Sequence, residues 1–194
     1  MTTQFKVHTP ETADSKSAEM LKAAQQKFGF TPNLLGVMAE APALLKGYMT
    51  IAQIFSETSF TETERQIVLL ETSYTNDCTY CMAAHSAISA MNNVPSDVVE
   101  ALRANTPIAD TKLEALRQFS RSIVTNKGYP TEAATAAFLK AGYGQQQMLE
   151  VILGVGFKTL SNYTNHITHT PLDEAFKPKQ WQKASCASGH CKAS

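Results

Sequence analysis

The sequence has no excess of charge of either sign. Lysine and arginine together number 17, and aspartate and glutamate also number 17. Without a net positive charge, no global field holds the phosphate backbone of a nucleic acid or an anionic membrane surface. Neutrality also gives little electrostatic repulsion between copies of the chain. We therefore expect neither a nucleic acid nor a membrane as partner, and we expect the chain to tolerate association into a homo-oligomer.

Long apolar runs and a secretory signal are also missing. The opening MTTQFKVHTPETADSK is polar and lacks an apolar core with a small-residue cleavage site, and no later run is long enough to span a bilayer. Glycine (9 residues) and proline (8) are too few for extensive disorder. These features favour a cytoplasmic globular protein. In that compartment the four cysteines are more readily catalytic, metal-binding or free than structural disulfides.

Alternating strand patterns are not found, whereas apolar residues recur three and four apart along nearly the whole chain, which predicts an all-α fold. Gly29 suits the left-handed end of a helix over residues 18–28. Thr31 can cap the next helix, with Pro32 in its first position. Thr61 and Glu64 offer a capping box to the apolar run that follows. Further predicted helices are 43–55, one opening at the cysteines, and four more after Pro95, the last of them long.

Composition divides the chain into a polar N-terminal arm (1–17), a helical domain (18–177) and a tail (178–194). The tail mixes Lys, Ser, Ala and Gly with one Trp and is predicted to be poorly ordered. It carries Cys186, His190 and Cys191, which would bind metal or exchange disulfides if they have a function. A tail without function is the simpler interpretation.

The most informative stretch is Cys78-Thr-Tyr-Cys81-Met-Ala-Ala-His85. Spacings of three and then four keep these three side chains on one helical face. Asp77 is a good N-cap, so Cys78 is predicted to open a helix whose N-terminal partial positive charge favours the thiolate. His85 is nearer to Cys81 by helical phase. We therefore predict Cys81 as the nucleophile that attacks a peroxide, Cys78 as the thiol that resolves the sulfenic acid, and an external dithiol as reductant.

Two neighbouring side chains have open interpretations. Glu71 lies seven residues before Cys78, on the same face only if the helix were continuous through Asn76-Asp77. We weigh a role in proton transfer equally with an ordinary solvent-facing carboxylate. Tyr80 either packs in the core or donates a hydrogen bond, and packing is favoured.

Two other classes of function compete with redox chemistry. The Cys78, Cys81 and His85 cluster has ligand types that zinc accepts, although no second pair stands at finger spacing. His166 and His169, or Cys191 of the tail, would have to complete such a site from far away, and we favour a polar helix end as the explanation of the two histidines. An oligomeric scaffold with inert, buried thiols is the third possibility.

The run from Glu64 to Ser86, ERQIVLLETSYTNDCTYCMAAHS, resembles the core of the alkylhydroperoxidase D and carboxymuconolactone decarboxylase family. The resemblance covers about residues 40–105, and Asn162-Tyr-Thr-Asn-His with the later Pro171-Leu-Asp173 is similar to close relatives of this group. It implies an all-helical fold, assembly into trimers or hexamers, a hydroperoxide substrate and no cofactor. It also implies the roles given above to Cys81 and Cys78, with His85 in the relay that deprotonates the thiol.

The sequence departs from the best-studied peroxidases of that family at two positions. They carry a glutamate twelve residues before the first cysteine and a histidine between the cysteines, where this chain has Gln66 and Tyr80. Neither side chain passes a proton as a carboxylate or imidazole does, so the relay is incomplete unless Glu71 or Glu64 substitutes. The sequence as a whole predicts a thiol-dependent peroxidase or disulfide oxidoreductase that uses an external dithiol or thiol protein as donor.

Overall fold

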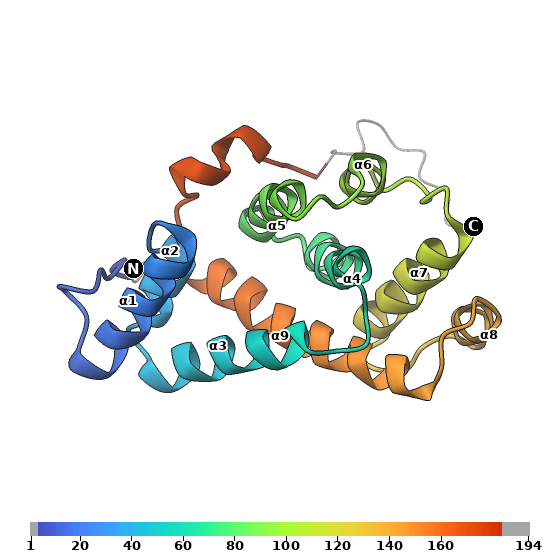
Figure 1. Ribbon diagram of the computed structural model, residues 1–194, viewed down its shortest axis with the longest axis horizontal. Helices are drawn as coiled ribbons and strands as arrows, with labels where there is room; N and C mark the ends of the chain where they lie inside the picture. The colour runs from blue at the N-terminus through green and yellow to red at the C-terminus, as the bar shows by residue number, and fades with distance from the viewer. Residues whose placement is uncertain (1–3, 184–194) are drawn as a thin grey trace.

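The computed structural model describes residues 4–183, and every regular element in that range is a helix (Figure 1). The predicted all-α class is confirmed. The elements are α1 (Ser15–Phe28), α2 (Asn33–Met38), α3 (Pro42–Ser56), α4 (Glu62–Thr75), α5 (Thr79–Met91), α6 (Ser96–Ala104), α7 (Thr111–Thr125), α8 (Glu132–Lys140), α9 (Gln145–Thr168) and the short 3-10 helix η1 (Glu174–Lys179). No helix in this range is long and apolar enough to cross a membrane.

Local signals at two helix ends act as predicted. Gly29 closes α1 with φ 79°, a left-handed conformation that costs glycine little. Thr61 and Glu64 form the capping box at the start of α4: the Thr61 amide donates to Glu64 Oε2 at 2.8 Å, and the Glu64 amide donates to Thr61 Oγ1 at 3.3 Å. Local residues therefore determine where the helix that leads to the cysteines begins.

Two predicted caps are wrong. Thr31 does not cap α2, because Pro32 is the N-cap residue and the amide of Asn33 donates instead to Asp173 Oδ1, 3.0 Å away. Asp77 does not cap α5, because it lies in the left-handed region (φ 57°) and Cys78 itself is the N-cap residue. A carboxylate brought by tertiary structure replaces the local cap in the first case, and a left-handed turn ends α4 in the second.

Helix α4 occupies the middle of the molecule. It packs against α5, α6, α7 and α9, and its run 67–70 is buried (Figure 1). Helix α3 lies along α9, where Tyr48 and Phe55 contact Phe157. Gly154 permits this close approach, since a Cβ there would lie 2.6 Å from the Phe55 ring and 2.8 Å from Val68. The packing holds α9 against the face of α4 that leads into the cysteine helix.

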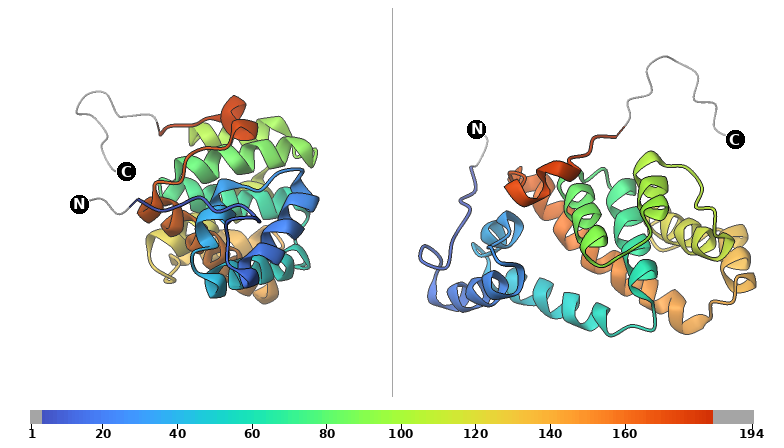
Figure 2. Two further views of the ribbon diagram at one scale, coloured as in Figure 1. Left: turned by 90° about the vertical axis from the view of Figure 1, so that its left-hand side faces the viewer. Right: turned by 45° about the horizontal axis from the view of Figure 1, so that its top comes forward.

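Residues 171–183, here called the C-terminal strap, run back from α9 across α5 (Figure 2). Tyr80 of α5 donates its hydroxyl to Asp173 Oδ2 at 2.5 Å and also packs edge-on against Phe176 at 6.1 Å. Trp181 is buried, and its indole donates to the carbonyl of Arg103 at 3.0 Å. The tail predicted from residue 178 therefore includes packed chain as far as Lys183, and Cys186, His190 and Cys191 lie outside the described residues.

Candidate active site

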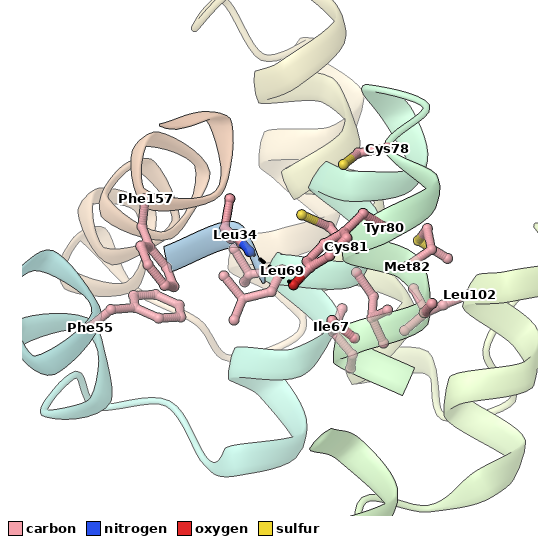
Figure 3. Packing of buried hydrophobic residues seen from close by; sticks show 14 of the residues in the cluster. Leu34, Phe55, Ile67, Leu69, Cys78, Tyr80, Cys81, Met82, Leu102 and Phe157 are labelled. Atoms are coloured by element: carbon pink, nitrogen blue, oxygen red, sulfur yellow. Dashed lines mark hydrogen bonds between the residues drawn. The ribbon is translucent and has the colours of Figure 1, made fainter. Parts of the chain in front are cut away.

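The two cysteines lie at the start of α5 as free thiols, each only 1% exposed. Cys78 is the N-cap residue of the helix and Cys81 follows in its first turn, so that both sulfurs lie near the same end of α5 (Figure 3). Tyr80, between the two cysteines, is fixed by α2, because the amide of Leu34 donates to its hydroxyl at 3.3 Å. The pair is thus close together and fixed within the core.

Helix α9 lays a polar stripe against these sulfurs. Its buried polar residues follow helical spacing, which puts them on one face. Asn165 Nδ2 donates to Cys81 Sγ at 3.2 Å and lies 3.7 Å from Cys78 Sγ. Ser161 Oγ is 3.7 Å from Cys81 Sγ. The members of the stripe are Lys158, Ser161, Asn162 and Asn165.

A chain of hydrogen bonds leads from Lys158 to His85 and on to the start of α4. Gln66 Nε2 donates to Glu62 Oε1 at 2.8 Å, which turns the Gln66 carbonyl oxygen toward His85 Nδ1, 2.9 Å away. Nδ1 therefore carries the proton, and Nε2 is left as an acceptor for the Lys158 ammonium at 2.6 Å. Gln66 cannot pass a proton, but it fixes the tautomer of His85.

The electrostatics of this group favour a thiolate at Cys81. Burial by itself would raise the pKa of Cys81, but the hydrogen bond from the Cys78 thiol and the positive charge of Lys158 outweigh it and lower the pKa to about 5. The hydrogen bond to Cys81, together with burial, raises the pKa of Cys78. Near neutral pH, Cys81 is therefore the thiolate and Cys78 the thiol.

Lys158 and His85 complete the charge pattern. Burial would lower the pKa of Lys158, which is 1% exposed, yet the neighbouring Cys81 thiolate raises it. Burial, and then the Lys158 charge, hold the pKa of His85 well below its usual range, so its imidazole is neutral. The centre of the site is a buried thiolate–ammonium pair with a neutral imidazole behind the ammonium.

A cavity of about 250 Å³ opens onto Cys78 from the outside, and Cys81 is not in its wall. We call it the Cys78 cavity. It lies between the turn that precedes α5 and the C-terminal end of α9. Its lining residues are Asp77, Cys78, Thr79, Tyr80, Asn165, His166, His169 and Thr170.

The structure does not bring Glu71 to the cysteines. Its carboxylate is bonded to the guanidinium of Arg117 at 2.8 Å and to that of Arg121 at 2.5 Å, both on α7. It is 0% exposed, so the expectation of a solvent-facing carboxylate is wrong. Glu64, the other predicted substitute in the relay, is bonded to Thr61 and accepts from the Tyr143 hydroxyl at 2.8 Å. Both carboxylates are engaged away from the sulfurs.

The predicted zinc cluster lacks the geometry of a metal site in the described chain. Within residues 4–183, no three His, Cys, Asp or Glu side chains are placed to hold one ion together. Both ring nitrogens of His85 face protein partners, Gln66 and Lys158. His166 is exposed at the end of α9 and His169 is its left-handed C-cap (φ 48°), in agreement with their interpretation as a polar helix end.

Comparison with known proteins places this arrangement on a known scaffold. No family model and no curated protein sequence matches the chain. Solved structures do. An alkylhydroperoxidase AhpD core from Ralstonia eutropha JMP134, an uncharacterized peroxidase-related protein, is 20% identical with a TM-score of 0.79, over 91% of this chain and 95% of its own. The chain has the alkylhydroperoxidase D-like fold.

Two further structures share the alkylhydroperoxidase D-like fold of this chain. A peroxidase-related protein from Silicibacter sp. TM1040 is 18% identical with a TM-score of 0.75, covering 90% of this chain and 95% of its own. The debrominase Bmp8, in complex with 2,3,4-tribromopyrrole, is 15% identical with a TM-score of 0.78, covering 92% of this chain and 96% of its own. Identities this low establish the shared fold only.

Sequence reasoning missed the α9 side of this site. A signal was present, because Lys158, Ser161, Asn162 and Asn165 recur at the spacing of one helical face. That face also holds Val151, Gly154 and Phe157, which are buried. A lysine in register with core residues indicates a buried charge that needs a partner.

Proposed function

We propose that the protein is a thiol-dependent peroxidase that reduces small hydroperoxides at Cys81. The observation that carries the proposal is the Cys81 sulfur, held as a thiolate by the buried Lys158 ammonium with the Cys78 thiol beside it. A thiolate is the nucleophilic form of cysteine, and a neighbouring thiol prevents its over-oxidation by closing a disulfide. The alkylhydroperoxidase D-like fold and the peroxidase-related names of two structural neighbours support the same reaction class.

In the first step, the Cys81 thiolate attacks the terminal oxygen of the hydroperoxide. A sulfur–oxygen bond forms, the oxygen–oxygen bond breaks, and the alkoxide leaves with the electron pair. Lys158 is the acid of this step, because its ammonium neighbours the reacting sulfur and its charge stabilises the departing anion. Proton transfer from Lys158 gives the alcohol, a Cys81 sulfenic acid and a neutral amine facing the His85 imidazole.

In the second step, Cys78 resolves the sulfenic acid. The negative charge that raised the pKa of Cys78 is lost once Cys81 is oxidised, so its thiol ionises more readily. Its sulfur attacks Cys81 sulfur, the sulfur–oxygen bond breaks, and the departing hydroxide takes the Cys78 proton to leave as water. Two electrons have passed from the thiol pair to the peroxide, and an external dithiol returns them.

Access constrains the substrate. Both sulfurs are nearly inaccessible, and the cavity reaches Cys78 and Asn165 before Cys81. A hydroperoxide must therefore be narrow enough to pass these side chains. We expect hydrogen peroxide and unbranched alkyl hydroperoxides to react faster than bulky tertiary ones.

The test is hydroperoxide consumption with a dithiol donor, by wild type, Cys81→Ser and Cys78→Ser. A Cys186→Ser variant is the matched control, since it removes a thiol outside residues 4–183. We expect turnover to vanish in Cys81→Ser, to stall after one oxidation in Cys78→Ser, and to be unchanged in the control. Equal turnover in wild type and Cys81→Ser would overturn the proposal. Wild-type thiols that resist both peroxide and alkylation would support the inert scaffold instead.

A further inference from the structure

The Cys78 cavity contains two imidazoles that the peroxidase reaction does not use. His166 comes from the last turns of α9 and His169 from its C-cap, and both line the cavity with Cys78. They are not gathered as metal ligands, because no metal-binding group of three His, Cys, Asp or Glu exists in residues 4–183. Their shared position over a redox-active sulfur needs another explanation.

A second observation marks this cavity as a place where a ligand binds. Asn165 lines the cavity and is only 6% exposed. Its Nδ2 donates to the sulfurs of Cys81 and Cys78. Its Oδ1 is buried and has no hydrogen-bond partner within residues 4–183. A buried acceptor left unsatisfied is costly, so a ligand donor group, such as a thiol S–H, is the natural complement.

We propose that the Cys78 cavity is the docking site of the reducing dithiol, where the donor sulfur attacks Cys78 and the His166 and His169 imidazoles accept its protons. The inference rests on the proposed function in one respect, namely that Cys78 and Cys81 cycle between dithiol and disulfide. It adds which cysteine meets the donor and which groups handle the protons of the resetting reaction.

The direction of attack follows from access and from the leaving group. In the disulfide state the donor thiolate reaches Cys78, which lines the cavity, before Cys81, which does not. Attack on Cys78 expels Cys81, the sulfur that Lys158 stabilises as an anion, and a thiol of lower pKa leaves faster. Attack on Cys81 would expel Cys78, whose pKa burial raises more than Lys158 lowers it. Both considerations select Cys78.

The electrons and protons of the cycle balance. The first donor thiol gives its proton to an imidazole and forms a mixed disulfide with Cys78, while Cys81 leaves as a thiolate paired with Lys158. The second donor thiol attacks the first donor sulfur, the bond to Cys78 breaks, and Cys78 takes up a proton. The donor is oxidised to a disulfide by two electrons and the protein disulfide is reduced. The proton that the imidazole accepted restores the Lys158 ammonium, which gave up one proton in the peroxide step.

Several titratable groups surround the two imidazoles and enter any pH profile. Asp77 and Cys78 face them from the turn before α5, and Tyr80 faces them from α5 itself. Tyr163 of α9 lies near His166, with the two rings tilted and their centroids 6.2 Å apart. Cys81 is behind Cys78 and does not line the cavity.

The first test measures reduction of the disulfide alone. The disulfide is formed with diamide, so the result does not depend on any peroxidase activity, and dithiothreitol is then added over a range of pH. The test variant combines His166→Gln with His169→Asn, because asparagine tolerates the left-handed backbone of position 169. His8→Gln, a histidine outside the cavity, is the matched control. Circular dichroism verifies that each variant keeps its helix content.

We expect the double variant to be reduced at least about tenfold more slowly than wild type near pH 7, as for loss of a general base. The difference should close at a pH above the donor thiol pKa, where the donor is already a thiolate. Oxidation of the pre-reduced variant by peroxide should be unchanged, which separates this inference from the proposed function. Wild-type reduction rates at every pH, or a slowing by the same factor at every pH, would overturn the role of the imidazoles.

The second test uses wild-type protein and locates the attacked sulfur. The disulfide form is treated with a small monothiol, 2-mercaptoethanol, while iodoacetamide traps the sulfur that is released, and peptides are analysed by mass spectrometry. We expect the monothiol on Cys78 and the alkyl group on Cys81. The reverse distribution would overturn the assignment of Cys78 as the donor-facing sulfur.

Discussion

Replacing Lys158 by methionine removes the buried ammonium while keeping most of the side-chain volume. In the structure, Lys158 Nζ lies 2.6 Å from His85 Nε2, and its charge is among the causes that lower the pKa of Cys81. Together with the hydrogen bond from the Cys78 thiol, this charge keeps Cys81 as a thiolate against the cost of burial. Without it, the pKa of Cys81 should rise toward its ordinary value.

The magnitude follows from the shift itself. The pKa of Cys81 is lowered from 9.0 to about 5. Loss of the whole shift would lower the thiolate fraction near pH 7 from about 99% to roughly 1%, about 100-fold, and this is the upper limit for Lys158→Met because the other hydrogen bonds to Cys81 remain. A thiolate of higher pKa is intrinsically more nucleophilic, with a Brønsted slope of about 0.4–0.5, which returns roughly 40- to 100-fold. The two effects nearly cancel near neutrality, so a rate at that pH says little.

The decisive quantity is therefore the midpoint of the pH profile. We expect the thiolate absorbance of Cys81 in a Cys78→Ser background to titrate at a clearly higher pH with methionine than with lysine at position 158. Alkylation near pH 5 should be slower in the Lys158→Met variant, by up to about 50- to 100-fold if the whole shift is lost. The serine hydroxyl of the background protein still donates a hydrogen bond to the thiolate, so the Cys78→Ser replacement is conservative. A midpoint that moves by less than about one pH unit would refute the role given to Lys158.

Three further changes separate structural from chemical roles. Glu71→Gln removes the buried carboxylate that pairs with Arg117 and Arg121, while Glu114 at 3.2 Å still pairs with Arg117. It should lower the free energy of unfolding in urea by about 3 kcal/mol, with the Cys81 midpoint unchanged. A shifted midpoint would restore Glu71 to the proton relay. Gly154→Ala should lower the stability of the fold by about 1–3 kcal/mol, because the added Cβ would lie 2.6 Å from the Phe55 ring. The control Gly156→Ala, whose Cβ would have no atom within 4 Å, should be neutral or stabilising by up to about 1 kcal/mol. Equal changes in the melting temperature of the two variants would contradict this packing. The pKa of His85 lies well below 6.5, so the unfolded chain binds a proton that the folded chain does not as pH falls through about 6.5. The urea midpoint of unfolding should therefore fall on acidification, and it should fall less in His85→Gln. Plots of urea midpoint against pH that run parallel for the two proteins would argue against a buried neutral imidazole.

The sequence predicted those features that depend on local chemistry. Gly29 ends α1 because only a left-handed residue closes that turn without strain, and Thr61 with Glu64 caps α4 because their spacing matches the capping box. The Cys78 and Cys81 spacing likewise places both sulfurs at the start of a helix. Each of these depends on residues only a few positions apart.

Contacts that depend on tertiary packing could not be predicted from the local sequence pattern. Lys158 stands 77 residues after Cys81 in the chain, and only the packing of α9 against α4 and α5 brings it to the sulfur. Glu71 follows an apolar run, but its partners Arg117 and Arg121 come from a helix whose position is not written in the local pattern. The cap of α2 is the carboxylate of Asp173, 140 residues away. Buried charges are satisfied by distant partners that periodicity does not reveal.

The most direct test of the central claim is to identify the sulfur that a hydroperoxide oxidises. Reduced Cys78→Ser protein, which cannot close the disulfide, is treated with one equivalent of hydrogen peroxide in the presence of dimedone, a trap for sulfenic acid, and is digested for mass spectrometry. The account predicts a dimedone adduct on Cys81 in this variant and none at the site in Cys81→Ser. An unmodified Cys81 under these conditions, or an adduct that forms on Cys78 in the Cys81→Ser protein at the same rate, would contradict it.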